Sequence, residues 1–208
     1  MSAFKQVIQT EAELRDILGY AGRAAQNKVI TELDDICRAF IANSPFVLLG
    51  STDANGNMDV SPKGDPAGFV QVMDGKTLLI PDRPGNRRGD TLSNILQNPQ
   101  IGMLFLVPGR RETLRINGTA QIVRDEEVRE RFTIQGKMPI FVIAVTVREV
   151  FFHCTKCVVR SGLWSSEQEA EHDELASLGA AIVKHARLDI TVAEADAMVA
   201  EEEATELY

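Results

Sequence analysis

Positively charged side chains gather in one part of an otherwise acidic chain. Between residues 83 and 115, six arginines stand against only two acidic residues, Asp90 and Glu112, whereas the whole chain of 208 residues has a formal net charge of -8. The arginines occupy positions 83, 87, 88, 110, 111 and 115. A local excess of cations indicates an anionic partner, and the planar guanidinium fork matches phosphate oxygens in charge and geometry. The sequence therefore predicts a phosphate-binding site.

Two of these arginines precede a segment that we expect to be helical. Arg87 and Arg88 come just before Asp90 or Thr91, where the helix should begin, and Pro99 should end it. Free backbone N–H groups and the helix dipole favour an anion at a helix N-terminus. The alternative is that the arginines form ordinary surface salt bridges, which are common in proteins.

The sequence offers less for other kinds of chemistry. Of three cysteines, Cys37 falls in a helical pattern, while Cys154 and Cys157 follow His153 in the motif HCTKC. A strand is expected to continue through this motif and would place the two thiols on opposite faces. No second pair of ligands accompanies them, so we favour a structural role and predict no metal site. No residue presents itself as an obligatory acid or base, and the catalytic residues stay unknown.

Composition and charge exclude several classes of protein. With 44% hydrophobic and 25% charged residues, the chain can bury one substantial core. No apolar run approaches the roughly 20 residues that cross a bilayer, and the start lacks the pattern of a signal peptide, so we expect a cytoplasmic protein without membrane contact. Residues 167–208 hold twelve acidic against two basic residues, which argues against a nucleic-acid partner.

Helices are expected before the strands. Residues 10–18 open with a Thr-x-x-Glu capping box, and residues 31–41 place Leu33, Ile36, Cys37 and Phe40 on one helical face. Both helices are expected to pack on a β-barrel, so residues 1–43 form the first of three regions.

Strand patterns dominate the second region, residues 44–160. Turn residues at 53–57 and 74–76 predict hairpins, and the last long strand should cover 139–153. The prolines within 61–66 predict a shaped loop there, because proline removes a ladder donor. The helix before Pro99 should turn Leu92, Ile95 and Leu96 inward. Strands joined by hairpins without alternating helices predict a mainly β, α+β fold built on a closed barrel.

The third region, residues 161–208, reads as acidic helices. A break is expected near Asp189, followed by a capping box from Thr191 to Glu194. The acidic run is most simply a solvated helix face, and covering a neighbouring subunit is the alternative.

Four motifs occur in an informative order. They are GSTDANGNMDVSPKGDPAGFV, LLIPDRPGNRRGDTLSNILQNPQIGMLFLVPGR, ETLRINGTA and FFHCTKCVVRSGLW, followed by the ending ELY. Over about residues 30–208 this order resembles the FMN-binding split-barrel proteins of the pyridoxamine 5'-phosphate oxidase superfamily, in a bacterial branch of probable FMN-dependent enzymes. The resemblance implies a six-stranded antiparallel split β-barrel that works as a homodimer, with FMN in clefts between the subunits.

The resemblance also implies which residues hold FMN. Lys63, Arg87 and Arg88 would neutralise its phosphate, and the backbone of residues 79–82 would bond the edge of the isoalloxazine ring. Thr113 stands where the oxidase has a glutamine. The implied cofactor contacts are Lys63, Leu79, Ile80, Pro81, Asp82, Asn86, Arg87, Arg88, Thr113 and Arg115.

A later motif, RSGLW, partly matches oxidase residues beside flavin and substrate. It implies that Arg160, Ser161 and Trp164 contact the substrate or the cofactor of the second subunit. The alternative for Trp164 is burial at a dimer interface. His153 and Lys156 are candidates for substrate contact only. The oxidase's closing substrate motif is not recognisable, so oxidation of pyridoxamine phosphate is not carried over.

These residues lead to three hypotheses of function. The first is an FMN-dependent oxidoreductase that transfers hydride between FMN and a small-molecule substrate or NAD(P)H. The second is a non-catalytic protein of the same fold that binds flavin, deazaflavin or haem, for which His153, His172 and His185 are the only possible histidine ligands. The third and weakest is a DNA-binding regulator that uses the basic loop at 109–111.

Overall fold

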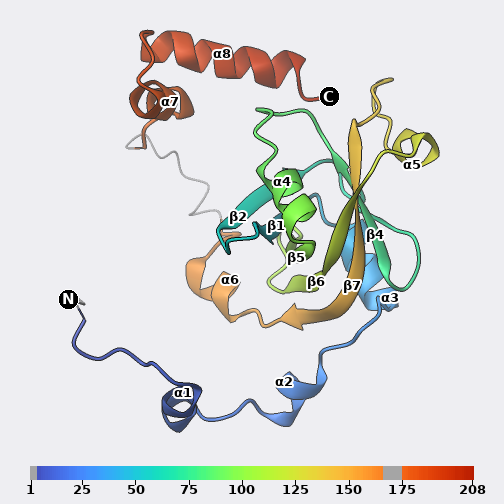
Figure 1. Ribbon diagram of the computed structural model, residues 1–208, viewed down its shortest axis with the longest axis vertical. Coiled ribbons are helices and arrows are strands. Elements are labelled where there is room, and N and C mark those ends of the chain that lie inside the picture. Colours follow the sequence, from blue (N-terminus) through green and yellow to red (C-terminus); the bar gives the residue numbers. More distant parts are fainter. Residues whose placement is uncertain (1–3, 166–174) are drawn as a thin grey trace.

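A seven-stranded antiparallel sheet forms the centre of the molecule (Figure 1). The computed structural model describes residues 4–165 and 175–208. The strands follow one another in the order β2-β1-β5-β6-β7-β4-β3. Their bounds are β1 Phe46–Thr52, β2 Met58–Gly64, β3 Gln71–Val72, β4 Thr77–Asp82, β5 Gln100–Leu106, β6 Thr113–Val123 and β7 Phe141–His153.

Short helices surround this sheet and extend from both ends of the chain (Figure 1). Their bounds are α1 Glu11–Leu18, α2 Arg23–Asn27, α3 Asp35–Ala42, α4 Asp90–Gln97, α5 Glu126–Glu130, α6 Lys156–Ser161, α7 Leu178–Ala186 and α8 Val192–Thr205. The prediction of a mainly antiparallel β protein with peripheral helices is therefore confirmed.

The number of strands differs from the expected six. The shortest strand is β3, which has only two residues and pairs with β4 in the hairpin predicted around residues 74–76, whereas the number six came from the resemblance. Among the described residues no ladder joins the outer strands β2 and β3, so the hydrogen-bonded order is that of an open sheet.

The core lies against the long strands β6 and β7. Fully buried side chains from these strands and from β5 include Phe105, Leu114, Ile116 and Val145. The two long strands pair along their length, with a bulge between Asn117 and Gly118.

Of the first helices, only α3 contributes to the core. Asp34 caps it by accepting a hydrogen bond from the Cys37 N–H at 2.8 Å, so the helix begins at Asp35. Cys37 and Ile41 are buried, whereas Ile36 is 68% exposed, contrary to prediction. Helices α1 and α2 have no buried residues. The expectation that both predicted helices pack on the sheet therefore holds for residues 31–41, which contain most of α3, and is wrong for residues 10–18, which contain α1.

Strand β2 continues through the segment that we expected to be a loop. Pro62 pairs opposite Leu48 of β1. Because β2 is an outer strand of the sheet, only one of its edges pairs with another strand. The backbone N–H group that proline lacks therefore leaves no second neighbouring strand without a hydrogen-bond donor. The prediction of a loop was wrong because it excluded only a central strand and did not consider that the segment could be a strand at the edge of the sheet.

Helix α4 faces the sheet through Ile95, which is buried, and partly through Leu92. Leu96 is 78% exposed, so its predicted inward orientation was wrong. The capping box of Thr191 and Glu194 is confirmed at the start of α8. Part of the expected C-terminal helical segment, residues 166–174, lies outside the described residues. Within the described part of the chain, no helix is long and apolar enough to cross a membrane.

The HCTKC motif forms a corner between a strand and a helix. Strand β7 ends at His153 and α6 begins at Lys156, so Cys154 and Cys157 lie one helical turn apart. The expectation that a strand places them on opposite faces was wrong. Both cysteines are exposed.

Candidate functional site

A cavity of about 840 Å³ opens beside the outer strand β2. It is lined by residues 59–63 of β2, residues 82–92 from the end of β4 to the first turn of α4, residues 137–141, Glu206 and Tyr208. Its size falls in the range of cavities that hold drug-sized ligands and cofactors. Five of the predicted cofactor contacts line it, namely Lys63, Asp82, Asn86, Arg87 and Arg88.

The start of α4 forms the basic side of this cavity. Gly89 occupies the N-cap position in the left-handed region, with φ 66°, and has no side chain to accept the first helical N–H groups. Arg87 is also left-handed, with φ 60°, a conformation that costs energy for a residue with a side chain. An Asx turn from the Arg88 N–H to Asn86 Oδ1, at 3.0 Å, supports this loop. The arrangement leaves backbone donors for an anion at the helix start.

The three predicted phosphate ligands differ in their partners. The Arg88 Nε lies 2.7 Å from Asp90 Oδ2, and the Lys63 Nζ lies 3.4 Å from Asp82 Oδ1. The side chain of Arg87 makes no ion pair or hydrogen bond with any residue that the structure describes. The salt-bridge alternative therefore describes Arg88 and Lys63 in this structure, while Arg87 stays available to an anionic ligand.

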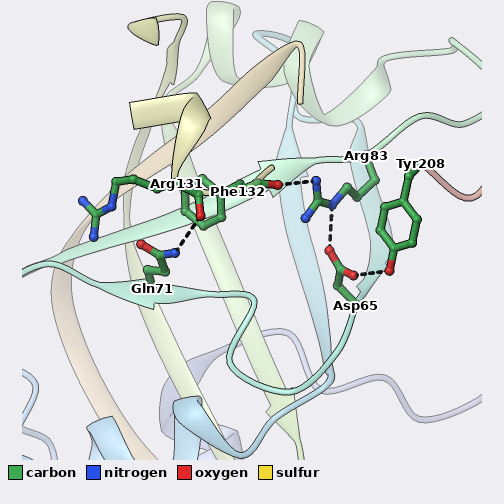
Figure 2. A network of polar contacts seen from close by, with 6 residues as sticks. All are labelled: Asp65, Gln71, Arg83, Arg131, Phe132 and Tyr208. Atoms are coloured by element: carbon green, nitrogen blue, oxygen red, sulfur yellow. Dashed lines mark hydrogen bonds and ion pairs between the residues drawn. The ribbon is translucent and has the colours of Figure 1, made fainter. Parts of the chain in front are cut away.

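A polar network joins the end of the chain to the cavity wall (Figure 2). Asp65, whose side chain is 1% exposed, accepts hydrogen bonds from Arg83 Nε at 2.6 Å and from the Tyr208 hydroxyl at 2.8 Å. The Arg83 guanidinium also lies over the Tyr208 ring and donates to the Phe132 carbonyl oxygen. The neighbouring carboxylate raises the pKa of Tyr208 above its ordinary value. The Lys137 Nζ donates to the Tyr208 carbonyl oxygen, which fixes the same residue from a second side.

Sequence reasoning missed several residues of this wall. Asp59 accepts a hydrogen bond from the buried Thr91 hydroxyl at 3.0 Å, which ties β2 to α4. Alternation along β2 could have indicated that Asp59 and Lys63 point to the same side, because residues of equal parity share a face. Tyr208 lies 143 positions from Asp65, and no local pattern in the sequence could have indicated their contact.

The remaining predicted residues lie outside the cavity of a single chain. Leu79, Ile80 and Pro81 are buried, and the first two belong to the apolar core. Thr113 is buried at the start of β6, and the Arg115 guanidinium lies over the Phe151 ring. As contacts to a cofactor bound between subunits, they stay predictions.

The RSGLW residues also lie away from the cavity of this chain. Arg160 and Ser161 end α6, and the Trp164 Nε1 donates to the Arg110 carbonyl oxygen at 2.7 Å. This hydrogen bond holds the loop after α6 near the turn between β5 and β6. Trp164 is 39% exposed, so a second subunit could still contact it.

The cavity fits a phosphorylated planar cofactor such as FMN. Its basic side holds Arg87 and the uncapped start of α4, and residues 138–141 contribute apolar groups from Met138, Ile140 and Phe141. A ligand with a dianionic phosphate and a flat ring needs both kinds of surface. Fold and site thus define an antiparallel β protein with a cavity whose basic side, at the start of α4, suits a phosphorylated cofactor.

The sequence places the chain within one family. The family model described as pyridoxamine 5'-phosphate oxidase matches residues 33–154, more than half of the chain. The chain belongs to this family, which confirms the resemblance seen in the ordered motifs.

Several solved structures are similar to this chain. HupZ from Group A Streptococcus is 22% identical, with a TM-score of 0.49 over 58% of this chain and 93% of that one. A putative pyridoxamine 5'-phosphate oxidase from Lactobacillus delbrueckii is 23% identical, with a TM-score of 0.48 over 59% and 95%. An FMN-binding protein from Syntrophomonas wolfei is 12% identical, with a TM-score of 0.45 over 56% and 83%. No curated protein matches.

Proposed function

We propose that this protein is an FMN-dependent oxidoreductase that transfers hydride between FMN and a small-molecule substrate or a reduced nicotinamide. The observation that carries the proposal is the cavity in which Arg87, without a partner among the described residues, stands beside the uncapped start of α4. Membership of the pyridoxamine 5'-phosphate oxidase family supports it. A cytoplasmic homodimer is part of the same proposal.

The basic side of the cavity would bind the phosphate of FMN. Arg87 offers a guanidinium fork, and the first turn of α4 offers backbone N–H groups and the positive end of its dipole. Arg88 and Lys63 would exchange Asp90 and Asp82 for phosphate oxygens, or share them. For these two residues the exchange replaces one charge-assisted contact with another, so the net gain on binding comes chiefly from Arg87 and the start of α4, which give up no such partner.

The flavin ring supplies the capacity to accept and return a hydride, while the protein orients it and limits access of water. The apolar side chains of Met138, Ile140 and Phe141, which also line the cavity, would cover the ring. The Tyr208 network would hold the end of α8 against this wall. The contribution that we assign to the chain is positioning of the two reactants.

The histidines disfavour haem as the ligand. His153 ends β7 and His185 lies in α7, and neither lines the cavity, whereas His172 lies outside the described residues. Deazaflavin is the remaining alternative, since the same phosphate ligands could serve either ring.

Absorption spectra test the proposal directly. The protein is mixed with FMN, passed through gel filtration, and the retained cofactor is identified by mass. We expect a flavin spectrum at one FMN per chain. Anaerobic mixing with NADPH, NADH and pyridoxamine phosphate in turn should then bleach the flavin with at least one of them. A colourless protein would overturn FMN binding, and retained flavin that no reductant bleaches would favour the non-catalytic binding protein.

A further inference from the structure

Cys154 and Cys157 form a pair of accessible thiols at the junction of β7 and α6. Both are exposed, whereas Cys37, the only other cysteine, is buried in the core. The Cys157 Sγ points back along the chain and lies 4.0 Å from the Cys154 carbonyl oxygen. The intervening Thr155 has helical φ and ψ, so the two cysteines are separated by a single helical turn.

This pair does not form part of a metal centre. Among residues 4–165 and 175–208, no group of three His, Cys, Asp or Glu residues is arranged to hold a metal ion. The adjacent His153 ring instead contacts the Phe151 ring, at 5.0 Å between centroids. Two thiolates without further ligands fall short of the four that a structural zinc site requires. A dithiol reaction needs only the two sulfurs.

The local backbone is suited to closing a disulfide. Cys154 directly precedes Thr155, which is helical in φ and ψ, and Cys157 lies in the first turn of α6. Positions three apart on a helix have Cβ atoms about 5–6 Å apart, and a disulfide requires about 3.5–4.5 Å. The junction can supply this small movement, because α6 has only six residues and Thr155 makes no side-chain hydrogen bond at its N-cap. Cys154 itself lies between the last strand residue and the helix, where no ladder or helix bond restrains it.

We propose that Cys154 and Cys157 are a reversible redox site that exchanges with low-molecular-weight disulfides such as glutathione disulfide. One cysteine thiolate attacks the glutathione disulfide, which forms a mixed disulfide and releases one glutathione thiolate. The second cysteine thiolate attacks the protein sulfur of the mixed disulfide, which closes the Cys154–Cys157 bond and releases the second glutathione. The protein loses two electrons and two protons, and glutathione disulfide gains them as two glutathione molecules.

Closing this bond would act on the arm that carries α6 and Trp164. Val158, next to Cys157, is buried and anchors the helix to the core. The arm then returns to the sheet through the hydrogen bond from Trp164 to the Arg110 carbonyl oxygen. A change in the first turn of α6 is therefore transmitted toward Trp164. Because Trp164 is the chain's single tryptophan, its fluorescence reports on this arm alone.

The test uses the full chain in a series of glutathione buffers of increasing oxidised fraction. Each sample is quenched in acid, its free thiols are alkylated, and intact mass and peptide masses are measured. We expect loss of two alkylation sites together, a mass lower by two hydrogens, and a peptide in which residues 154 and 157 are joined. Cys37 should stay reduced throughout, since burial raises the pKa of its thiol to about 12. Trp164 fluorescence should change with the same midpoint.

Single substitutions separate the proposed site from general thiol oxidation. C154S and C157S should each retain a stable mixed disulfide with glutathione, because no second thiol resolves it, whereas C37S should close the ring as the wild type does. Independent glutathione adducts on both cysteines of the wild-type chain would overturn the proposal. A mass that stays fully reduced across the buffer series, while a surface-thiol reagent still modifies both cysteines, would overturn it as well.

Discussion

At the scale of single residues, Arg87 is the group on which the proposed phosphate site depends most. Its backbone has φ 60°, and its side chain has no partner among the described residues, while Arg88 is paired with Asp90. A strained residue with an uncommitted cation at a helix start is typical of a ligand site.

Removing these cations should weaken binding of FMN selectively. R87A combined with R88A should raise the Kd for FMN by about tenfold to a hundredfold. The loss comes chiefly from Arg87, whose charge-assisted contact contributes about 1.5–3 kcal/mol, because Arg88 only exchanges Asp90 for the phosphate. Riboflavin, which lacks the phosphate, should bind both proteins with similar affinity. Fluorescence titration of each flavin measures the ratio.

The matched control is R148A, which removes an exposed arginine on β7 that contacts Gln100. It should leave both affinities unchanged. Equal weakening of FMN and riboflavin by the double substitution would show that the arginines shape the cavity without binding the phosphate.

His153 should make stability depend on pH. Its pKa is lowered from its ordinary value of 6.5, first by burial and then by the charges of Lys28 and Arg115. The unfolded chain therefore binds a proton at this histidine more readily than the folded one. The contribution of neutral His153 to stability is fully present above pH 6.5 and is lost as the pH falls through the folded-state pKa. Urea unfolding at about pH 8 and about pH 5 should show a larger loss for wild type than for H153Q. Parallel losses in the two proteins would contradict this assignment.

Residue roles were predictable where local chemistry decides them. The position of Arg87 and Arg88 before α4 and beside the cavity could be predicted, because they directly precede a helix start, while their role as phosphate ligands stays a prediction. The inward positions of Ile36 and Leu96 were wrong, since the face that a short helix buries depends on its first residue and on how it docks. Asp65, Arg83 and Tyr208 could not be found together, because only the tertiary fold brings them into contact.

At the scale of elements, the bulge between β6 and β7 depends on a glycine. A Cβ atom added to Gly118 would overlap the Thr146 carbonyl group of the paired strand. G118A should therefore lower the free energy of unfolding by about 1–3 kcal/mol, as overpacked substitutions do. Chemical denaturation measures the difference.

Gly50 provides the matched control, since it is also a strand glycine. A Cβ there would lie 3.7 Å from the Gly102 carbonyl oxygen, an ordinary contact. G50A should change stability by less than about 1 kcal/mol. Equal effects of the two substitutions would mean that the β6–β7 spacing adapts to a side chain.

The end of α8 should be held to the cavity by Tyr208. Y208F keeps the ring beside Arg83 but loses the hydrogen bond to Asp65. We expect faster hydrogen exchange in α8 and faster dissociation of FMN, because the wall formed by Glu206 and Tyr208 is released more often. Y20F is the control, since Tyr20 is 82% exposed and lies outside the cavity. Unchanged exchange in α8 would show that the hydrogen bond to Asp65 does not hold it, and would leave Lys137 and the Arg83 ring contact as its attachments.

Element types were largely predictable, while their ends and edges were not. The hairpins, the long strand β7 and the capping box of α8 follow from turn residues and periodicity. Pro62 was misplaced because a sequence does not reveal which strand lies at a sheet edge. The Cys154–Cys157 corner was misread because the strand pattern ends only one residue earlier, at His153.

At the scale of the whole molecule, the proposed dimer would bring together predicted site residues that lie apart on one chain. Arg87 and Arg88 line the cavity of one chain, while Arg160, Ser161 and Trp164 lie elsewhere on it. If each FMN site combines the arginines of one chain with the RSGLW segment of the other, both groups belong to one site. Light scattering should then give twice the chain mass of 22.9 kDa.

Mixing two inactive variants tests whether the site is shared. The R87A/R88A protein and a W164A protein should each bind FMN poorly, and after joint refolding a mixed dimer contains one site with both groups intact. Since half of randomly formed dimers are mixed, about one site in four should regain FMN affinity. No recovery, although light scattering and a tag on one variant prove that mixed dimers have formed, would show that Trp164 and the arginines do not meet across the interface. Recovery of the expected fraction would place one FMN in each of two equivalent clefts, because only a site built from both chains can be restored in this way.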